Sequence, residues 1–422
     1  MKSYGNMLLI AMPIFLALII VEQLWGWFKH KEKPHLVDTI SSIASGMTNI
    51  LKSTLGLTIV IISYPWLLQH LSLIHWNLSS FWPYVITFIF FDFTGYWEHR
   101  LNHRVNFFWN HHIIHHSSEE YNLPCALRQQ ISVFTNLLTI VTLPLAVLGI
   151  PAEVLAVVGP IHLFAQFWYH TRYIGKLGFL EYFLVTPSHH RVHHAMNDVY
   201  MDKNYGQIFI FWDKWFGTFQ EERENEIPIY GMRRPAGTWN PFFINFKHLF
   251  LLIKDSYRTR SIRDKFKVWL MPTGWRPSDV ATSYPVFTLE KAEQVRKYRP
   301  SYSINFEMFS IIHGTVIFLL LCFLFSRFGE IGREEMLLYG LFLLMEIFGF
   351  TSFLDKKWYG WGMMLACALA GSFYVLYTGN WFGLNSILPY GNWMVGGYLI
   401  GSVTIAALLM RSLPNAILHS ES

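Results

Sequence analysis

The chain has 422 residues, of which 52% are hydrophobic, 18% are aromatic and only 14% are charged. This composition is typical of a protein that crosses a membrane several times, and it argues against a disordered or fibrous chain. The net charge of +5 is explained by anionic headgroups and basic loops, so we expect no nucleic-acid partner.

Apolar stretches of roughly the length that crosses a bilayer, about 17 to 25 residues, recur along the chain. In the first, Glu22 and Gln23 stand where a cleavable signal needs small residues, so we expect this stretch to remain as a helix. A short Gly-Ile-Pro-Ala connection between the fourth and fifth predicts a tight helical hairpin. The nine predicted spans are Met7–Trp27, Ser45–Leu67, Trp82–Trp97, Val133–Ile150, Val154–Phe167, Phe309–Phe325, Met336–Phe353, Gly360–Tyr377 and Met394–Met410.

The distribution of basic residues predicts the orientation of these spans. Lys and Arg follow the first, third, seventh and ninth spans and are frequent in 171–305, whereas 69–81 has none. The positive-inside rule therefore places the amino terminus outside and the long segment 171–305 in the cytoplasm. Within this segment, Trp212 and Trp215 are predicted interfacial anchors, and 242–253 is predicted to be a helix that lies in the interface or packs on the protein.

Three tight clusters of histidine follow predicted spans or lie in the long cytoplasmic segment. They are His99-Arg-Leu-Asn-His103, His112-Ile-Ile-His115-His116 and His190-Arg-Val-His193-His194. Helical positions i, i+3 and i+4 share one face, so each cluster can direct two or three ring nitrogens toward one point. Imidazole is a good ligand for iron, zinc, copper and nickel. Three clusters with nearly repeated spacing predict a polynuclear metal site on the cytoplasmic side.

The other residue types narrow the chemistry of this site. The three cysteines form no CxxC pair, and the carboxylates lack the Glu-x-x-His spacing of soluble di-iron bundles. A tetrahedral zinc binds four ligands, fewer than the imidazoles in these clusters. Two metals with four to five nitrogens each would account for their number. Iron is the natural choice where O₂ must oxidise an aliphatic membrane substrate. The predicted fold is an all-α polytopic membrane protein, a transmembrane helical bundle with a cytoplasmic histidine-rich di-metal site.

Several longer motifs carry a family resemblance. They are Gly95-Tyr-Trp-Glu-His-Arg, His115-His-Ser-Ser-Glu-Glu-Tyr-Asn, Thr186-Pro-Ser-His-His-Arg-Val-His-His, Asp202-Lys-Asn-Tyr and Trp212-Asp-Lys-Trp-Phe-Gly-Thr-Phe. Together they resemble the fatty acid hydroxylase/sterol desaturase superfamily of membrane di-iron oxygenases, and within it the branch that cleaves ether lipids. The resemblance covers about residues 82–275. It implies O₂-dependent hydroxylation of a lipid chain beside an ether oxygen, which yields a fatty aldehyde and a glycerol derivative.

The resemblance also implies which residues bind the metals. Carried over by position, the ligands are His99, His103, His112, His115, His116, His170, His190, His193 and His194. We expect His189 to be an outer residue that hydrogen-bonds a ligand, and Asn204 to bond one as well. Gln166 stands where other branches have a histidine paired with His170, and it could bond a metal-bound water or simply pack. Asp92 shares a helical face with His99, so we expect it to orient that ring by a hydrogen bond.

Organisation and cofactors follow from the same resemblance. We expect N-terminal transmembrane helices over 1–81, a fatty acid hydroxylase-like di-iron domain over 82–275, a cytoplasmic connector over 276–305 and C-terminal transmembrane helices over 306–422. Two iron ions, O₂ and an external reductant are implied, with a lipid substrate from the bilayer and a soluble electron donor. Arg104 stands where animal members of the branch carry an acidic residue, which argues against their reductant, tetrahydrobiopterin, although it stays possible.

Other functions stay open. The same site could hydroxylate or desaturate a fatty acyl chain, a sterol or a carotenoid, since that choice depends on fine positioning. A zinc-dependent membrane hydrolase would need Glu98 or Glu119 as a general base. A metal transporter should have ionisable residues along several spans, but the last four are almost purely apolar and His313 is isolated. We expect His111 to be a surface residue and His162 to be a hydrogen-bonded histidine on a helix face.

Overall fold

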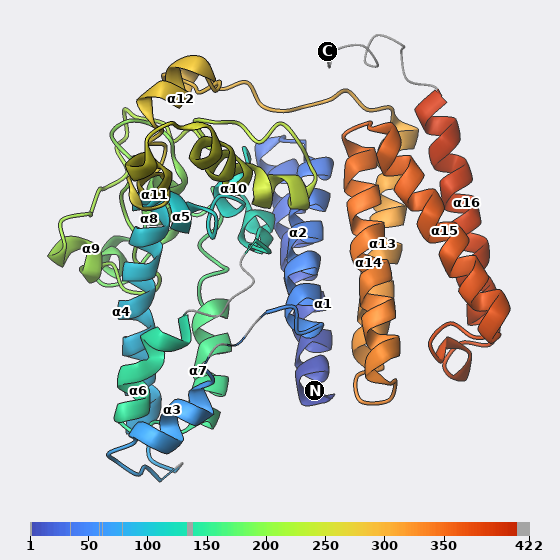
Figure 1. Ribbon diagram of the computed structural model, residues 1–422, viewed down its shortest axis with the longest axis horizontal. Helices are drawn as coiled ribbons and strands as arrows, with labels where there is room; N and C mark the ends of the chain where they lie inside the picture. Colours follow the sequence, from blue (N-terminus) through green and yellow to red (C-terminus); the bar gives the residue numbers. More distant parts are fainter. Residues whose placement is uncertain are drawn as a thin grey trace. The chain divides into compact units, whose positions relative to one another are not determined.

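The computed structural model describes residues 2–33, 35–58, 60, 62–77, 79–132 and 138–411. Helices make up the secondary structure of these residues, and two isolated bridges, Leu184–Phe209 and Ala195–Tyr230, are the only β pairings among them (Figure 1). The chain divides into two compact units, which are described separately. The predicted all-α fold is confirmed.

Unit 1 comprises the described residues within Met1–Leu55, Gly237–Phe243 and Tyr298–Ser422. Its helices are α1 (Lys2–His30), α2 (Leu36–Thr54), α13 (Ile304–Ser326), α14 (Arg333–Leu354), α15 (Trp358–Thr378) and α16 (Gly391–Arg411), with a short 3-10 turn, η6 (Leu384–Ser386). Helix α13 begins at Ser303, whose side chain accepts the backbone N–H of Phe306. Gly379 follows the end of helix α15 with a φ of 66°, in the left-handed region that favours glycine.

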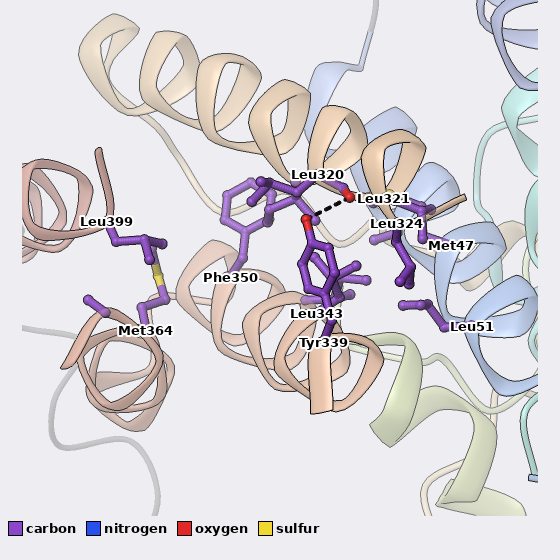
Figure 2. Close-up of a cluster of buried hydrophobic side chains, with 14 of the residues drawn as sticks. Met47, Leu51, Leu320, Leu321, Leu324, Tyr339, Leu343, Phe350, Met364 and Leu399 are labelled. Carbon is purple, nitrogen blue, oxygen red and sulfur yellow. Dashed lines mark hydrogen bonds between the residues drawn. The ribbon is translucent and has the colours of Figure 1, made fainter. Parts of the chain in front are cut away.

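The core of unit 1 is built from the apolar faces of these helices. Figure 2 shows leucines of α13 meeting Leu343 and Phe350 of α14 and Leu51 of α2. Tyr339 is fully buried among them because its hydroxyl donates to the backbone carbonyl of Leu320 at 2.9 Å. The burial of apolar side chains on several helices at once is what fixes this unit.

Five helices among the described residues are long and apolar enough to cross a membrane. They are Met7–His30 within α1, and the whole of α13, α14, α15 and α16. These helices confirm the first and the last four predicted spans and support a multi-pass membrane protein. Helix α4 (Trp82–Arg104) contains the third predicted span and continues into the first histidine cluster.

The second predicted span, Ser45–Leu67, is wrong. Helix α2 ends at Thr54, and the next helix, α3 (Tyr64–Leu71), starts only after a break. Gly56 lies in this break with a φ of 65°, and Pro65 lies at the start of α3, where a missing N–H is tolerated. A hydropathy pattern cannot detect such a break, because the residues around it are still apolar.

The fifth predicted span is too short to cross a bilayer, and the fourth lies partly outside the described residues. Residues 133–137 lie outside the described part, and the remainder of the fourth forms only the 3-10 turn η3 (Leu138–Thr142) and α6 (Leu143–Val147). The fifth corresponds to α7 (Ala152–Phe164), whose 13 residues extend about 20 Å, less than a bilayer core.

Unit 2 comprises the described residues within Gly56–Ala236 and Ile244–Lys297 and contains all three histidine clusters. Besides α3, α4, α6, α7 and η3, its elements are α5 (Asn106–Trp109), η1 (His115–Ser117), η2 (Leu123–Leu127), η4 (Gly178–Tyr182), α8 (Pro187–His194), α9 (Phe211–Trp215), α11 (Ile262–Leu270), α12 (Ser278–Ser283) and η5 (Ala292–Gln294). Helix α10 (Pro241–Arg258) begins in unit 1 and continues in unit 2; it confirms the helix predicted over 242–253.

Candidate metal centre

Helix α8 carries the third histidine cluster. Pro187 opens it, which suits a position where a backbone N–H has no helical partner. Every residue of α8 is buried, including His190, His193 and His194. Helix α4 contributes His99 and His103 from its last two turns, on one face of the helix.

The remaining histidines lie outside long helices. The second cluster starts in the turns after α5 and ends in the 3-10 turn η1, which contains His115 and His116. His170 follows the turns that end α7 and is buried. These short elements place the second cluster and His170 beside the rings from α4 and α8.

The nine histidines implied as ligands fall into two groups, each with ligand atoms within 4.8 Å of one another. Group one contains His99, His103, His112, His116 and His193, and group two contains His115, His170, His190 and His194. Each cluster directs two rings toward one group, as predicted, and the third ring of the second and third clusters joins the other group. Adjacent helical residues point about 100° apart, so His115 and His116, and likewise His193 and His194, serve different groups.

Within each group the Nε2 atoms converge. In group one, the Nε2 atom of His99 lies 2.9 Å from that of His112, and the Nε2 atom of His116 lies 3.1 Å from those of His103 and His193. In group two, the corresponding distances are 2.9 Å for His190–His170, 3.0 Å for His194–His115, 3.1 Å for His194–His190 and 3.3 Å for His170–His115.

The loop Asp202–Gly206 determines the tautomers of two rings in group one. Nδ1 of His99 donates to the backbone carbonyl of Tyr205 at 2.8 Å, and Nδ1 of His193 donates to that of Lys203 at 3.0 Å. A carbonyl oxygen only accepts, so Nδ1 carries the proton in both rings and Nε2 keeps its lone pair. His170 in group two is held in the same way by the carbonyl of Gln166, at 2.9 Å.

The pKa values agree with neutral rings. Burial, followed by the neighbouring imidazoles, lowers the pKa of His112, His116 and His194 well below the ordinary value. Burial lowers the pKa of His170 to about 3, although hydrogen bonds to the backbone oppose the change. At neutral pH these rings are therefore uncharged, which is the form that binds a metal.

This donor set fits two metal ions. Two nitrogens that bind one metal at about 2.0–2.1 Å, with angles between 90° and 110°, lie about 2.9–3.4 Å apart, and the convergent Nε2 atoms match this range. Lone pairs directed at one another at these distances repel unless a cation lies between them. Neither group contains a carboxylate among the described residues. The arrangement can therefore hold one metal in five nitrogens and another in four.

The loop that supports group one is itself held by Asp213. One carboxylate oxygen of Asp213 accepts the N–H of Tyr205 and the other that of Gly206, both at 2.7 Å. Sequence reasoning missed Asp213, Lys203 and Tyr205. A signal was available, since Asp202 and Asp213 begin or lie within motifs of the family resemblance.

Asp92 does not form the predicted hydrogen bond to His99, whose Nδ1 bonds Tyr205 instead. The fully buried carboxylate accepts the N–H of Ile208 at 2.8 Å, the indole N–H of Trp212 at 2.7 Å and Nε2 of His162 at 3.1 Å. The prediction of a surface anchor is therefore also wrong for Trp212, whereas Trp215 is 70% exposed. The backbone N–H groups of Ile208 and Phe209, the indole of Trp212 and the ring of His162 lie within reach of Asp92, whereas His99 lies about two turns further along α4.

The other outer residues contact the ligand segments through the backbone. Asn204 donates to the carbonyls of His189 and Gln220, at 3.0 and 2.7 Å, rather than to a ligand ring. Nδ1 of His189 lies 3.2 Å from the carbonyl of Leu184, so this ring stabilises the entry to α8. The backbone of Gln166 supports His170, while its side chain faces His162.

Three further residues are placed by the structure. His162 is buried and bonded to Asp92, as predicted for a satisfied histidine. His111 belongs to neither histidine group, and its backbone N–H donates to the carbonyl of Phe108. Arg104 pairs with Asp202 at 3.0 Å, and the same carboxylate lies 3.8 Å from Nδ1 of His103.

Comparisons with known proteins agree with this geometry. Residues 84–218 match the family model described as "Fatty acid hydroxylase", which includes all nine clustered histidines. No solved structure gives a significant match.

Curated relatives extend the match over most of the chain. The chain is 36% identical to the alkylglycerol monooxygenase of Homo sapiens over 352 residues, which cover 82% of this chain and 77% of the relative. It is 30% identical to that of Xenopus tropicalis, over 81% and 76% of the two chains, and 31% identical to that of Caenorhabditis elegans, over 78% and 68%.

Proposed function

This chain belongs to the alkylglycerol monooxygenase family and is a membrane lipid oxygenase, and from this premise we propose that it cleaves O-alkyl ether lipids with two iron ions bound by its nine clustered histidines. The observation that carries the proposal is the convergence of neutral Nε2 atoms into groups of five and four. Such a donor set has no use without metals, and an oxygenase needs metals or another cofactor that reacts with O₂.

The proposed reaction is the one that the name of the relatives, alkylglycerol monooxygenase, describes. A monooxygenase transfers one oxygen atom of O₂ to its substrate and reduces the other to water, which consumes two electrons and two protons. Insertion at the chain carbon bonded to the ether oxygen gives a hemiacetal. This hemiacetal breaks its bond to the ether oxygen and yields a fatty aldehyde and a glycerol derivative. Bound iron would supply the activation of O₂.

The chain's own residues hold and shield the metals. Backbone carbonyls fix three rings with Nε2 directed inward, and the rings are buried, so water is largely excluded from the metals. We assign this chemistry to the domain over 82–275 and place its metal centre at the cytoplasmic face, as the distribution of basic residues predicts. There a lipid can enter from the bilayer and a soluble donor can supply electrons.

The proposal for the reductant depends on the residues at the edge of group one. Arg104 lies at the edge of group one, where its guanidinium pairs with Asp202. An electron donor that approaches this edge meets a paired arginine, which differs from the acidic residue predicted for animal members. We therefore propose an external two-electron reductant and do not require tetrahydrobiopterin.

The proposal is tested with purified protein in lipid nanodiscs. We expect two metal ions per chain, and fatty aldehyde from an alkylglycerol when iron, O₂ and either tetrahydrobiopterin or a ferredoxin system are supplied. A matched acyl glycerol is the control substrate. Hydroxylation of the acyl lipid without any oxidation of the ether lipid would instead assign the chain to fatty acyl hydroxylation, and a stoichiometry of one metal would overturn the di-iron site.

Orientation is tested separately. A reporter fused after Arg411 should behave as cytoplasmic, and one inserted near Asn77 should behave as external. Finding the Asn77 reporter on the same side as the histidine clusters would overturn the proposed topology.

A further inference from the structure

Two glutamine side chains meet between the segments that carry the two histidine groups. Gln207 directly follows the loop Asp202–Gly206, which supports group one, and Gln166 precedes His170 of group two by four residues. Their amides lie 3.4 Å apart, from Nε2 of Gln166 to Oε1 of Gln207. The mechanism described above uses neither side chain.

Gln207 reaches this place because Gly95 on α4 has no side chain. A Cβ atom added to Gly95 would lie 2.2 Å from Oε1 of Gln207 and 2.4 Å from its Cδ. Gly95 precedes His99 by four residues, so the amide lies over the helix face that presents His99, about 6 Å further along the axis. Gln207 therefore lies about one helical turn from His99 of group one, on the side of α4 that continues into the predicted span, and the backbone carbonyl of Gln166 contacts His170 of group two.

The hydrogen bonds that the protein makes to these amides are long for Gln166 and few for Gln207. Nε2 of Gln166 lies 3.2 Å from both Nδ1 and the carbonyl of His162, and its Oε1 lies 3.5 Å from the hydroxyl of Tyr169. These distances are at the long end of the hydrogen-bond range. For Gln207, the 3.4 Å contact is the one side-chain hydrogen bond within the described chain, although an amide offers two donors and two acceptor lone pairs.

Both amides also remain accessible. Gln166 and Gln207 are half-buried, whereas the neighbouring Phe167, Gly206 and Ile210 are buried. A half-buried amide whose hydrogen bonds are long or few is stabilised when a polar group binds it. This combination is characteristic of the polar contacts that orient a ligand in a mostly apolar site.

We propose that Gln166 and Gln207 bind the glycerol hydroxyls of the ether lipid. These contacts select the glycerol ether over a chain that ends in a simple ether. The inference rests on the proposed function. The carbon to be oxidised is bonded to the ether oxygen, and the glycerol hydroxyls follow within a few bonds. When that carbon is at the metals, the hydroxyls come within about one helical turn of them, which is where the amides lie. The oxygen of each amide can accept a hydrogen bond from a hydroxyl, and its N–H can donate one to a hydroxyl oxygen.

The experiment measures binding rather than turnover. Zinc-loaded protein in nanodiscs is titrated with radiolabelled hexadecylglycerol and, separately, with hexadecyl methyl ether, which has the same chain and ether but no hydroxyl. For Gln207→Leu and Gln166→Leu we expect at least about a 10-fold weaker binding of hexadecylglycerol and no change for the methyl ether, because a site built for hydroxyls loses selectivity without its polar partners. Gln69→Leu, on an exposed position of α3, is the matched control and should bind both ligands as the wild type does.

Gly95→Ala is the second variant, since its methyl group displaces the amide of Gln207 without removing it. We expect the same selective loss and an unchanged content of two metals. Glutamine variants that keep their metals could lose affinity equally for both ligands, or for neither. Either result would overturn this inference and leave the proposed function intact. If the wild-type protein neither binds nor cleaves an alkylglycerol, the proposed function itself is overturned.

Discussion

Buried histidine occurs in both units of the chain, and each unit neutralises it differently. In unit 1, His313 of α13 lies 3.0 Å from the carboxylate of Glu346 on α14, and its Nδ1 lies 2.9 Å from the hydroxyl of Tyr398 on α16. All of these contacts lie near the middle of helices long enough to cross a membrane. In the histidine centre of unit 2, nine rings gather with no carboxylate among their ligand atoms.

The difference separates a histidine that has a carboxylate as counter-charge from a centre that has none among the described residues. A His–Glu pair carries no net charge whether it is ionised or shares one proton, so it can be buried without another ion. Convergent lone pairs of neutral imidazoles need a cation. The last four spans are apolar overall, as predicted, but the prediction that His313 is isolated is wrong, because Glu346 of the next helix pairs with it. The His313–Glu346 pair contributes to the packing of unit 1, whereas the nine rings form the candidate metal centre.

The largest effect should come from removing a ring of the centre. His194→Ala and His116→Ala should abolish aldehyde formation and lower the metal content, because each group loses a ligand that no neighbour replaces. The protein should still insert in the membrane. His111→Ala is the control and should keep both metals and nearly full activity. Equal inactivation by His111→Ala would show that the ligands are assigned incorrectly.

Breaking the pair in unit 1 should affect stability rather than metal content. His313→Leu leaves the carboxylate of Glu346 unpaired, so we expect the free energy of unfolding in detergent to fall by about 3–5 kcal/mol. The double variant His313→Leu/Glu346→Leu should recover most of this loss, since neither charge remains. Both proteins should retain two metals. A double variant as unstable as the sum of the singles would contradict the comparison.

A smaller effect should follow from loosening the support of one group. Asp213→Asn replaces a carboxylate oxygen by an N–H donor that faces the N–H groups of Tyr205 and Gly206. We expect metal affinity in group one to fall by about 10- to 100-fold, with group two unchanged, as measured by competition with a chelator. Asp198→Asn, at a carboxylate that is 84% exposed, should leave both affinities unaltered.

The smallest effect concerns a buried histidine with neither metal nor carboxylate partner. Nε2 of His248 lies 3.0 Å from the carbonyl of Asn106, and burial lowers its pKa to about 4, with Arg234 lowering it further and Asp255 opposing. The unfolded chain therefore binds a proton below about pH 6.5 while the folded chain does not, so stability falls as the pH decreases toward 4.

At pH 5.5 this loss should be about 1.4 kcal/mol relative to pH 7.5. His248→Gln keeps a donor for the carbonyl of Asn106 but does not titrate, so its free energy of unfolding should depend less on pH in this range. Parallel pH curves for the two proteins, measured by denaturant unfolding, would exclude His248 as a contributor.

The sequence by itself determined the helices whose signal is local. Long apolar stretches identified α1 and α13–α16, and the spacing of His99 and His103, and of His190 and His194, placed each pair on one helix face. Longer motifs identified the family. These features are readable because a helix of 20 apolar residues, or a repeat of four residues, depends only on neighbours in the chain.

Only the tertiary structure decided how the rings divide and what holds them. Whether His115 joins His116 or His194 depends on where α8 lies, and Asp92 bonds Trp212 because a distant segment folds against α4. The motif Asp202-Lys-Asn-Tyr marks this loop, but the sequence does not show that the carbonyls of Lys203 and Tyr205 accept from the rings, since every residue has a carbonyl. The break at Gly56 was also decided by the tertiary structure, and so was the His313–Glu346 pair. Backbone turns and contacts between helices depend on packing and not on composition.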